Sequence, residues 1–144
     1  MCRRVHLIRI SMKPSEQSRF KVLLIDDDRF LLEMYSLKLT QENFEVRAAS
    51  SAKEALDVLK QFNADIIVFD IVMPEMSGLE FVSELRNGNI APNAILVALT
   101  NQSSDDDKIK AEALGVDEYI VKATSIPSEV VNKITEAIKK HSGA

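Results

Sequence analysis

Acidic residues end two apolar runs of this 144-residue chain. The run Ile66–Asp70 stops on its own carboxylate, and the run Lys21–Ile25 is followed directly by Asp26, Asp27 and Asp28. Apolar residues without alternation are typical of strands that are buried on both faces. A carboxylate inside a core costs several kcal/mol unless it is paired or bound to a metal, so we expect these acids where each strand leaves the sheet.

Carboxylates at the ends of neighbouring parallel strands would lie within a few ångströms of one another. Like charges this close repel, and a hard cation that neutralises them would stabilise the fold. An all-oxygen pocket favours Mg²⁺ or Ca²⁺ over zinc, and we expect Mg²⁺ because room remains for waters and a phosphate. By itself, Asp70 fits a turn before Met73 and Pro74 equally well.

Two further polar residues, Thr100 and Lys122, follow the apolar runs Ala94–Leu99 and Glu118–Val121. Each has an ordinary alternative role, Thr100 as a turn hydroxyl and Lys122 as a solvated lysine. Together with the acids they supply metal-binding carboxylates, a carboxylate nucleophile, and a hydroxyl and an ammonium for phosphoryl oxygens. The combination predicts a site that accepts a phosphoryl group.

The elements that position these residues alternate along the chain. A helix is predicted from Arg29 to about Thr40, because apolar residues recur at spacings of three and four: Phe30, Leu31, Met34, Tyr35 and Leu37. A short strand, Glu45–Ala49, follows it. Four further helices are predicted from their start signals. Two begin at the capping boxes of Ser51 and Ser77, one at Ser104 before an acidic first turn, and one at Pro127.

Strand and helix therefore alternate five times, which predicts an α/β protein. We expect a doubly wound, five-stranded parallel sheet in the flavodoxin-like order 2-1-3-4-5, with helices on both faces. The switch point between the first and third strands would place Asp26 and Asp27 beside Asp70.

Composition excludes several classes of protein. The net charge of −4 and a pI near 5.2 argue against direct nucleic-acid binding. No apolar run approaches the roughly 20 residues of a membrane span, and the single cysteine, Cys2, excludes an internal disulfide framework. We expect a cytoplasmic domain at residues 20–141, a flexible basic extension at 1–19 and a short tail at 142–144.

Four stretches resemble the response-regulator receiver domain of two-component signalling systems, including chemotaxis receivers. They are Val22–Asp28, Asp65–Gly78, Leu99–Thr100 and Gly115–Lys122. The resemblance covers roughly Phe20 to Lys140, and the D-x-x-M-P-x-x-x-G pattern from Asp70 to Gly78 is specific when it is combined with the acids, Thr100 and Lys122.

The resemblance implies that Asp70 accepts a phosphoryl group from a histidine kinase or a phosphotransfer protein. Asp26, Asp27, Asp70 and the backbone carbonyl of Val72 would bind Mg²⁺. Such a domain is a phosphoacceptor regulator that catalyses only its own phosphorylation and dephosphorylation, so it is not a conventional enzyme.

The resemblance also assigns the residues that respond to the phosphate. Lys122 would pair with Asp70 and then with the phosphate, Thr100 would hydrogen-bond the phosphate, and Tyr119 would rotate inward from a solvent-facing position. The fourth helix, fifth strand and fifth helix would then form the output surface for a protein target, a fused output domain or a phosphorylation-linked homodimer.

Two positions depart from the family pattern, and one acid has a separate role. Ala123 replaces a proline that usually follows a cis peptide bond, so we expect a trans Lys122–Ala123 bond. Asn101 is larger than the usual small residue after the threonine. Asp28 is expected to cap the first helix rather than to bind metal.

Two other functions remain open at this point. A pseudo-receiver would use the same fold as a protein-binding module without phosphorylation, but the complete set of acids, threonine and lysine argues against it. A phosphatase of the aspartyl-phosphate type would need a second aspartate two residues after the nucleophile, where this chain has Val72.

Overall fold

The computed structural model describes residues 20–101, 104–122 and 126–142. The predicted extension at 1–19, the last two residues and the Lys122–Ala123 bond lie outside this range, and their predictions remain open. No helix of the described residues is both long and apolar enough to cross a membrane.

Five parallel strands form one sheet in the order β2-β1-β3-β4-β5, which confirms the predicted fold class and strand order. The strands are β1 (Lys21–Ile25), β2 (Glu45–Ala49), β3 (Ile66–Asp70), β4 (Ile95–Thr100) and β5 (Glu118–Val121). In the central pairs Ile25 lies opposite Phe69, and Asp70 lies opposite Leu99. The carboxyl ends of β1, β3 and β4 therefore lie nearly level at one edge of the sheet.

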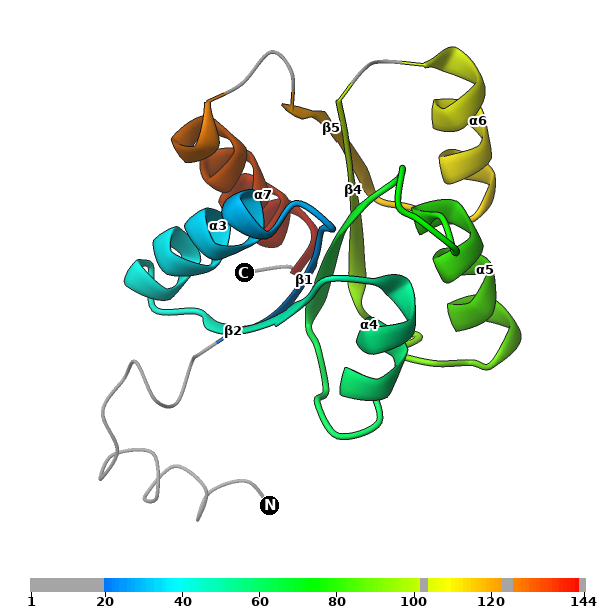
Figure 1. The fold of residues 1–144 in the computed structure, drawn as a ribbon, viewed down its shortest axis with the longest axis horizontal. Coiled ribbons are helices and arrows are strands. Elements are labelled where there is room, and N and C mark those ends of the chain that lie inside the picture. Colours follow the sequence, from blue (N-terminus) through cyan, green and yellow to red (C-terminus); the bar gives the residue numbers. More distant parts are fainter. Residues whose placement is uncertain (1–19, 102–103, 123–125, 143–144) are drawn as a thin grey trace.

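Helices cover both faces of the sheet (Figure 1). One face carries α3 (Arg29–Gln41) and α7 (Pro127–Ser142). The other carries α4 (Ala52–Val58), α5 (Gly78–Asn87) and α6 (Asp105–Ala113). This two-sided covering explains why β1, β3 and β4 are apolar without alternation.

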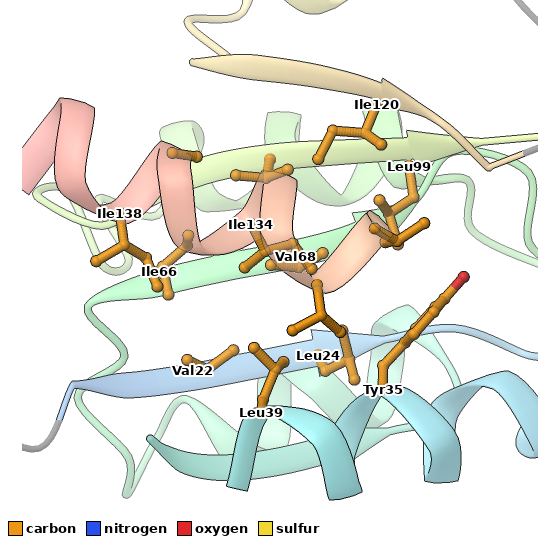
Figure 2. Packing of buried hydrophobic residues seen from close by; sticks show 14 of the residues in the cluster. Val22, Leu24, Tyr35, Leu39, Ile66, Val68, Leu99, Ile120, Ile134 and Ile138 are labelled. Atoms are coloured by element: carbon orange, nitrogen blue, oxygen red, sulfur yellow. The ribbon is translucent and has the colours of Figure 1, made fainter. Parts of the chain in front are cut away.

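Alternate residues of the strands enter two separate hydrophobic cores. Val22 and Leu24 of β1 belong to the core on the α3 and α7 side, and Leu23 and Ile25 belong to the core on the opposite side. Figure 2 shows the first of these, here called the α3/α7-side core. Complete burial of one such side chain contributes about 1.5–3 kcal/mol to folding.

The inward face of α3 agrees with the predicted one at Tyr35 but differs from it at Phe30 and Leu37. Leu32, Tyr35 and Leu39 are its buried residues, whereas Phe30 and Leu37 are 67% and 60% exposed. Both sets have helical spacing, so periodicity alone did not distinguish them. Packing on the sheet decides between them, because it selects the stripe that can contact β1 and α7.

Side chains cap the helices as predicted, with one difference. Asp28 caps α3 by accepting hydrogen bonds from the next turn, and Ser77 with Glu80 forms a complete capping box on α5. At α4, Ser51 accepts from the Glu54 amide, but the Glu54 carboxylate accepts from Ser50 instead of Ser51. The predicted capping box at α4 is therefore only half formed.

Gly78 lets the first turn of α5 pack directly against the end of β3. A Cβ atom at this position would lie 2.4 Å from the Asp70 carbonyl oxygen and 2.9 Å from the Ile71 Cα. Both neighbours are backbone atoms that cannot move aside without distorting the loop after Asp70.

Gly78→Ala should therefore destabilise the protein by about 3 kcal/mol, as overpacking against a rigid backbone does. Urea unfolding measures this difference. Gly88→Ala is the matched control, because its nearest neighbour at 3.1 Å is the flexible tip of Ile90. Equal unfolding free energies for the two variants would contradict the assigned role of Gly78.

Candidate functional site

The described residues include four buried polar or charged side chains, and all four lie at the carboxyl edge of the sheet. Asp70 and Thr100 end β3 and β4, while Asp26 and Lys122 directly follow β1 and β5. Their exposed fractions are between 0% and 7%. The four strand ends that the sequence singled out are thus brought to one edge of the sheet.

Lys122 bridges two of the carboxylates. Its Nζ atom donates to Asp26 Oδ2 at 3.0 Å and to Asp70 Oδ2 at 3.2 Å. All three side chains are at least 95% buried, so these contacts are little screened by water. Removal of the shared lysine would leave two buried carboxylates without a compensating charge, which is strongly destabilising.

Backbone amides orient the remaining carboxylate oxygens. The Asp28 amide donates to Asp26 Oδ1 at 2.9 Å, and the Val72 amide donates to Asp70 Oδ1 at 3.2 Å. Each buried carboxylate thus accepts one bond from the loop that follows its strand and one from Lys122. These bonds hold both acids toward the same point above the sheet edge.

The acids form a group that could hold a metal ion. Asp26, Asp27 and Asp70 each offer one carboxylate oxygen, and these oxygens lie within 4.8 Å of one another. Asp27, unlike the other two, is exposed, so the group opens to solvent on one side. Three ionised carboxylates and one ammonium leave two negative charges, which matches the charge of a divalent cation that prefers oxygen ligands.

Burial changes the titration of the site. Desolvation raises the pKa of Asp70 from 3.8 to about 6, and the Asp26 charge adds to this effect while Lys122 opposes it. For Lys122, desolvation acts to lower the pKa, but the hydrogen bonds and charges of Asp26 and Asp70 together outweigh it and the pKa is raised. Lys122 therefore stays protonated at neutral pH. Asp70 is ionised at neutral pH, but burial makes its ionised form less favourable than in water.

The raised pKa of Asp70 predicts a pH-dependent stability in metal-free protein. Ionisation of Asp70 costs folding energy as pH rises from about 4 to about 6, so Asp70→Asn should be more stable than wild type at pH 7 by about 1–3 kcal/mol. Below about pH 4 the carboxyl is protonated in both folded and unfolded chains, and this advantage should vanish.

Urea unfolding in the presence of EDTA at several pH values measures this difference. Asp57→Asn serves as the control, because Asp57 is an exposed carboxylate paired with Lys60. A stability difference between Asp70→Asn and wild type that did not change with pH would disprove the assigned cost of ionisation.

Three further predicted residues lie around this group. The Val72 side chain is 70% exposed, which leaves its identity free to vary, and its amide contacts Asp70. Thr100 stands one position beyond Leu99, the partner of Asp70. We expected the Tyr119 side chain to face solvent before phosphorylation. Its hydroxyl is instead buried, without a hydrogen-bond partner among the described residues.

The model for the response regulator receiver domain matches residues 22–135. This chain belongs to that family. The receiver domain is a signalling module of two-component systems, so the predicted family and the predicted class of function are confirmed.

Curated relatives of this receiver domain are longer proteins. The chain is 35% identical over 120 residues to the transcriptional regulatory protein YvrH of Bacillus subtilis, covering 83% of the chain and 49% of that protein. It is 33% identical over 116 residues to a probable cyclic di-GMP phosphodiesterase of Vibrio cholerae, covering 81% and 26%. The chain thus spans about half or less of the length of these relatives.

Solved structures of isolated receivers match this chain over almost their whole length. The chemotaxis protein CheY4 of Vibrio cholerae superposes with a TM-score of 0.76 at 28% identity, covering 83% of this receiver domain and 99% of that chain. A CheY-like receiver from Methanospirillum hungatei gives a TM-score of 0.77 at 26% identity, covering 88% and 98%.

Proposed function

We propose that this receiver domain is a phosphorylation-dependent switch that accepts a phosphoryl group on Asp70 from the phosphohistidine of a histidine kinase or a phosphotransfer protein. The observation that carries the proposal is the bridge from Lys122 to both Asp26 and Asp70 at 3.0 and 3.2 Å. A purely structural carboxylate gains nothing from a neighbouring acid that competes for its lysine.

In the proposed transfer, a carboxylate oxygen of Asp70 attacks the phosphorus of the donor. A P–O bond forms, the P–N bond breaks, and its electron pair remains on the imidazole nitrogen of the donor. Lys122 already lies beside Asp70 and can follow the negative charge onto the phosphoryl oxygens. Thr100, at the end of the adjacent strand, is the proposed hydroxyl donor to the same oxygens.

Mg²⁺ is the proposed cofactor. Asp26, Asp27, Asp70 and the backbone carbonyl of Val72 would hold it, and the net charge of the carboxylate group supports a divalent ion. When bound, the ion neutralises charge on the acids and on the incoming phosphoryl oxygens. The ion would bind reversibly to these carboxylates, which belong to the protein whether or not the ion is bound.

The proposed output surface is formed by α6, β5 and α7. Tyr119 on β5 contacts the core beneath α5 and α6, so a shift of Thr100 toward the phosphate could reach this surface through neighbouring strands. YvrH and the probable phosphodiesterase contain the receiver as part of a longer chain, so a further domain or a protein partner is the proposed recipient of the signal.

Incubation with acetyl phosphate and Mg²⁺ tests the proposal. Intact-mass measurement should show one added phosphoryl group that is stable to acid and labile to base. A protein that never gains the group would instead be a phosphorylation-independent binding module. Rapid, continuing turnover of added phosphate esters without stable label would indicate a phosphatase.

A further inference from the structure

Tyr35 brings a hydroxyl group into the α3/α7-side core. The other buried members of that core are all aliphatic, and Tyr35 itself is only 2% exposed. A leucine would fill a position among such neighbours without bringing a hydroxyl that must be accommodated. The phenol therefore calls for an explanation other than packing.

The hydroxyl of Tyr35 points toward the edge of the sheet that carries the candidate site. Figure 2 shows the ring extending from α3 along the strands toward their carboxyl ends, with the oxygen at its far tip. Helix geometry gives the reason, because side chains tilt toward the N-terminus of their helix, and α3 begins directly after Asp28.

The charges of the site act on this phenol. Burial raises the pKa of Tyr35, the Lys122 charge opposes that effect, and the charges of Asp26, Asp28 and Asp70 add to it. Lys122 is the charge with the largest influence. The direction of the ring and the effect of these charges both place the phenol on the side of the core that faces the lysine and the acids.

The hydrogen-bond requirement of Lys122 suggests what the phenol does. An ammonium has three N–H donors, and in this structure Asp26 and Asp70 accept from it. Lys122 is itself only 7% exposed, so it gives up a carboxylate contact in a buried position if it follows charge onto a phosphoryl group. A hydroxyl oxygen that points toward this edge of the sheet could accept a hydrogen bond from the ammonium during this exchange.

We propose that Tyr35 is a positioning residue for Lys122, whose hydroxyl supports the ammonium while it moves from a carboxylate to the phosphoryl oxygens. This inference rests on the proposed function of Asp70. It assigns a role in phosphoryl transfer to a helix residue that lies outside the group of acids, threonine and lysine.

The first test is the rate at which Tyr35→Phe accepts phosphate from acetyl phosphate. At saturating Mg²⁺ and donor the maximal rate should fall by about three- to tenfold, the effect of one hydrogen bond made in the transition state. The Mg²⁺ concentration for half-saturation should stay within about twofold of wild type, because Tyr35 is not a proposed ligand and one hydrogen bond to Lys122 changes ion binding little.

Ser36→Ala is the matched control. It removes a hydroxyl from the neighbouring residue of the same helix, and the Ser36 Oγ atom is buried without a partner among the described residues. Its phosphorylation rate should equal that of wild type. A Tyr35→Phe rate equal to the wild-type rate would overturn the inference while the labelling of Asp70 left the proposed function intact. Wild-type protein that accepts no label would overturn both.

The second test retains Tyr35 and so does not depend on how a Tyr35 variant folds. The chain has two tyrosines and no tryptophan, so Tyr119→Phe leaves Tyr35 as the single strong fluorophore. Addition of beryllofluoride with Mg²⁺, which mimics the phosphoryl group, should change the emission of Tyr35 as Lys122 moves. Unchanged emission, with binding verified by calorimetry, would overturn the inference.

Discussion

Asp70→Asn should accept no phosphoryl group from acetyl phosphate, whereas wild-type protein gains one. Asparagine keeps the shape of the side chain and an oxygen near the Val72 amide, but its amide has no anionic oxygen to attack phosphorus. Because the same substitution removes the cost of a buried charge, loss of labelling cannot be attributed to loss of fold. Intact-mass measurement after incubation with the donor and Mg²⁺ checks this result.

Asp65→Asn is the control for this experiment. Asp65 precedes β3 at the opposite end of the same strand, where its carboxylate accepts from the Lys21 amide. Its labelling should match that of wild type. If Asp70→Asn were labelled as fully as wild type, the acceptor would be another carboxylate, and Asp26, which shares Lys122 with Asp70, would be examined next.

Asp27→Ala should remove the stabilisation that Mg²⁺ gives to wild type. Ligand at one hundred times its Kd stabilises a protein by about 2.7 kcal/mol, which for a domain of this size raises the Tm by roughly 5–10 °C. Asp27 is the exposed member of the carboxylate group, so its removal leaves the buried bridge between Lys122, Asp26 and Asp70 in place. Thermal unfolding with and without millimolar Mg²⁺ measures the effect.

Asp28→Ala separates metal binding from helix capping. Asp28 caps α3, so this variant should lose about 1 kcal/mol of stability at every Mg²⁺ concentration. It should nevertheless keep the full increase in Tm on addition of Mg²⁺. A wild-type protein that shows no response to Mg²⁺, or an Asp27→Ala variant that responds as wild type does, would refute the proposed metal site.

The order and type of the elements could be predicted from the sequence because they depend on local patterns. The apolar run Ile66–Asp70 has the length of a strand and lacks helical spacing, and it is β3 in the structure. Five alternations of strand and helix admit few topologies, since crossovers are right-handed and buried parallel strands need helices on both faces. The carboxyl edge of the sheet followed from this topology.

The contents of the candidate site could be predicted for a similar reason. Asp26, Asp70, Thr100 and Lys122 each interrupt or follow an apolar run, and burial of polar groups is costly enough to make such positions conspicuous. Their meeting at one edge needed only the strand order. The hydrogen bonds within the site could not be predicted from the sequence, which did not show that Lys122 donates to Asp26 as well as to Asp70.

Tertiary packing decided which side chains of α3 and of β5 point inward. Phe30 and Leu37 have the same spacing as Leu32 and Leu39, yet only the second pair is buried. The sequence likewise left open that the Tyr119 hydroxyl is buried and that the Tyr35 hydroxyl points toward the carboxyl edge of the sheet. Periodicity determines which residues share a face, but the neighbours of that face come from distant parts of the chain, and only their packing selects the face that is buried.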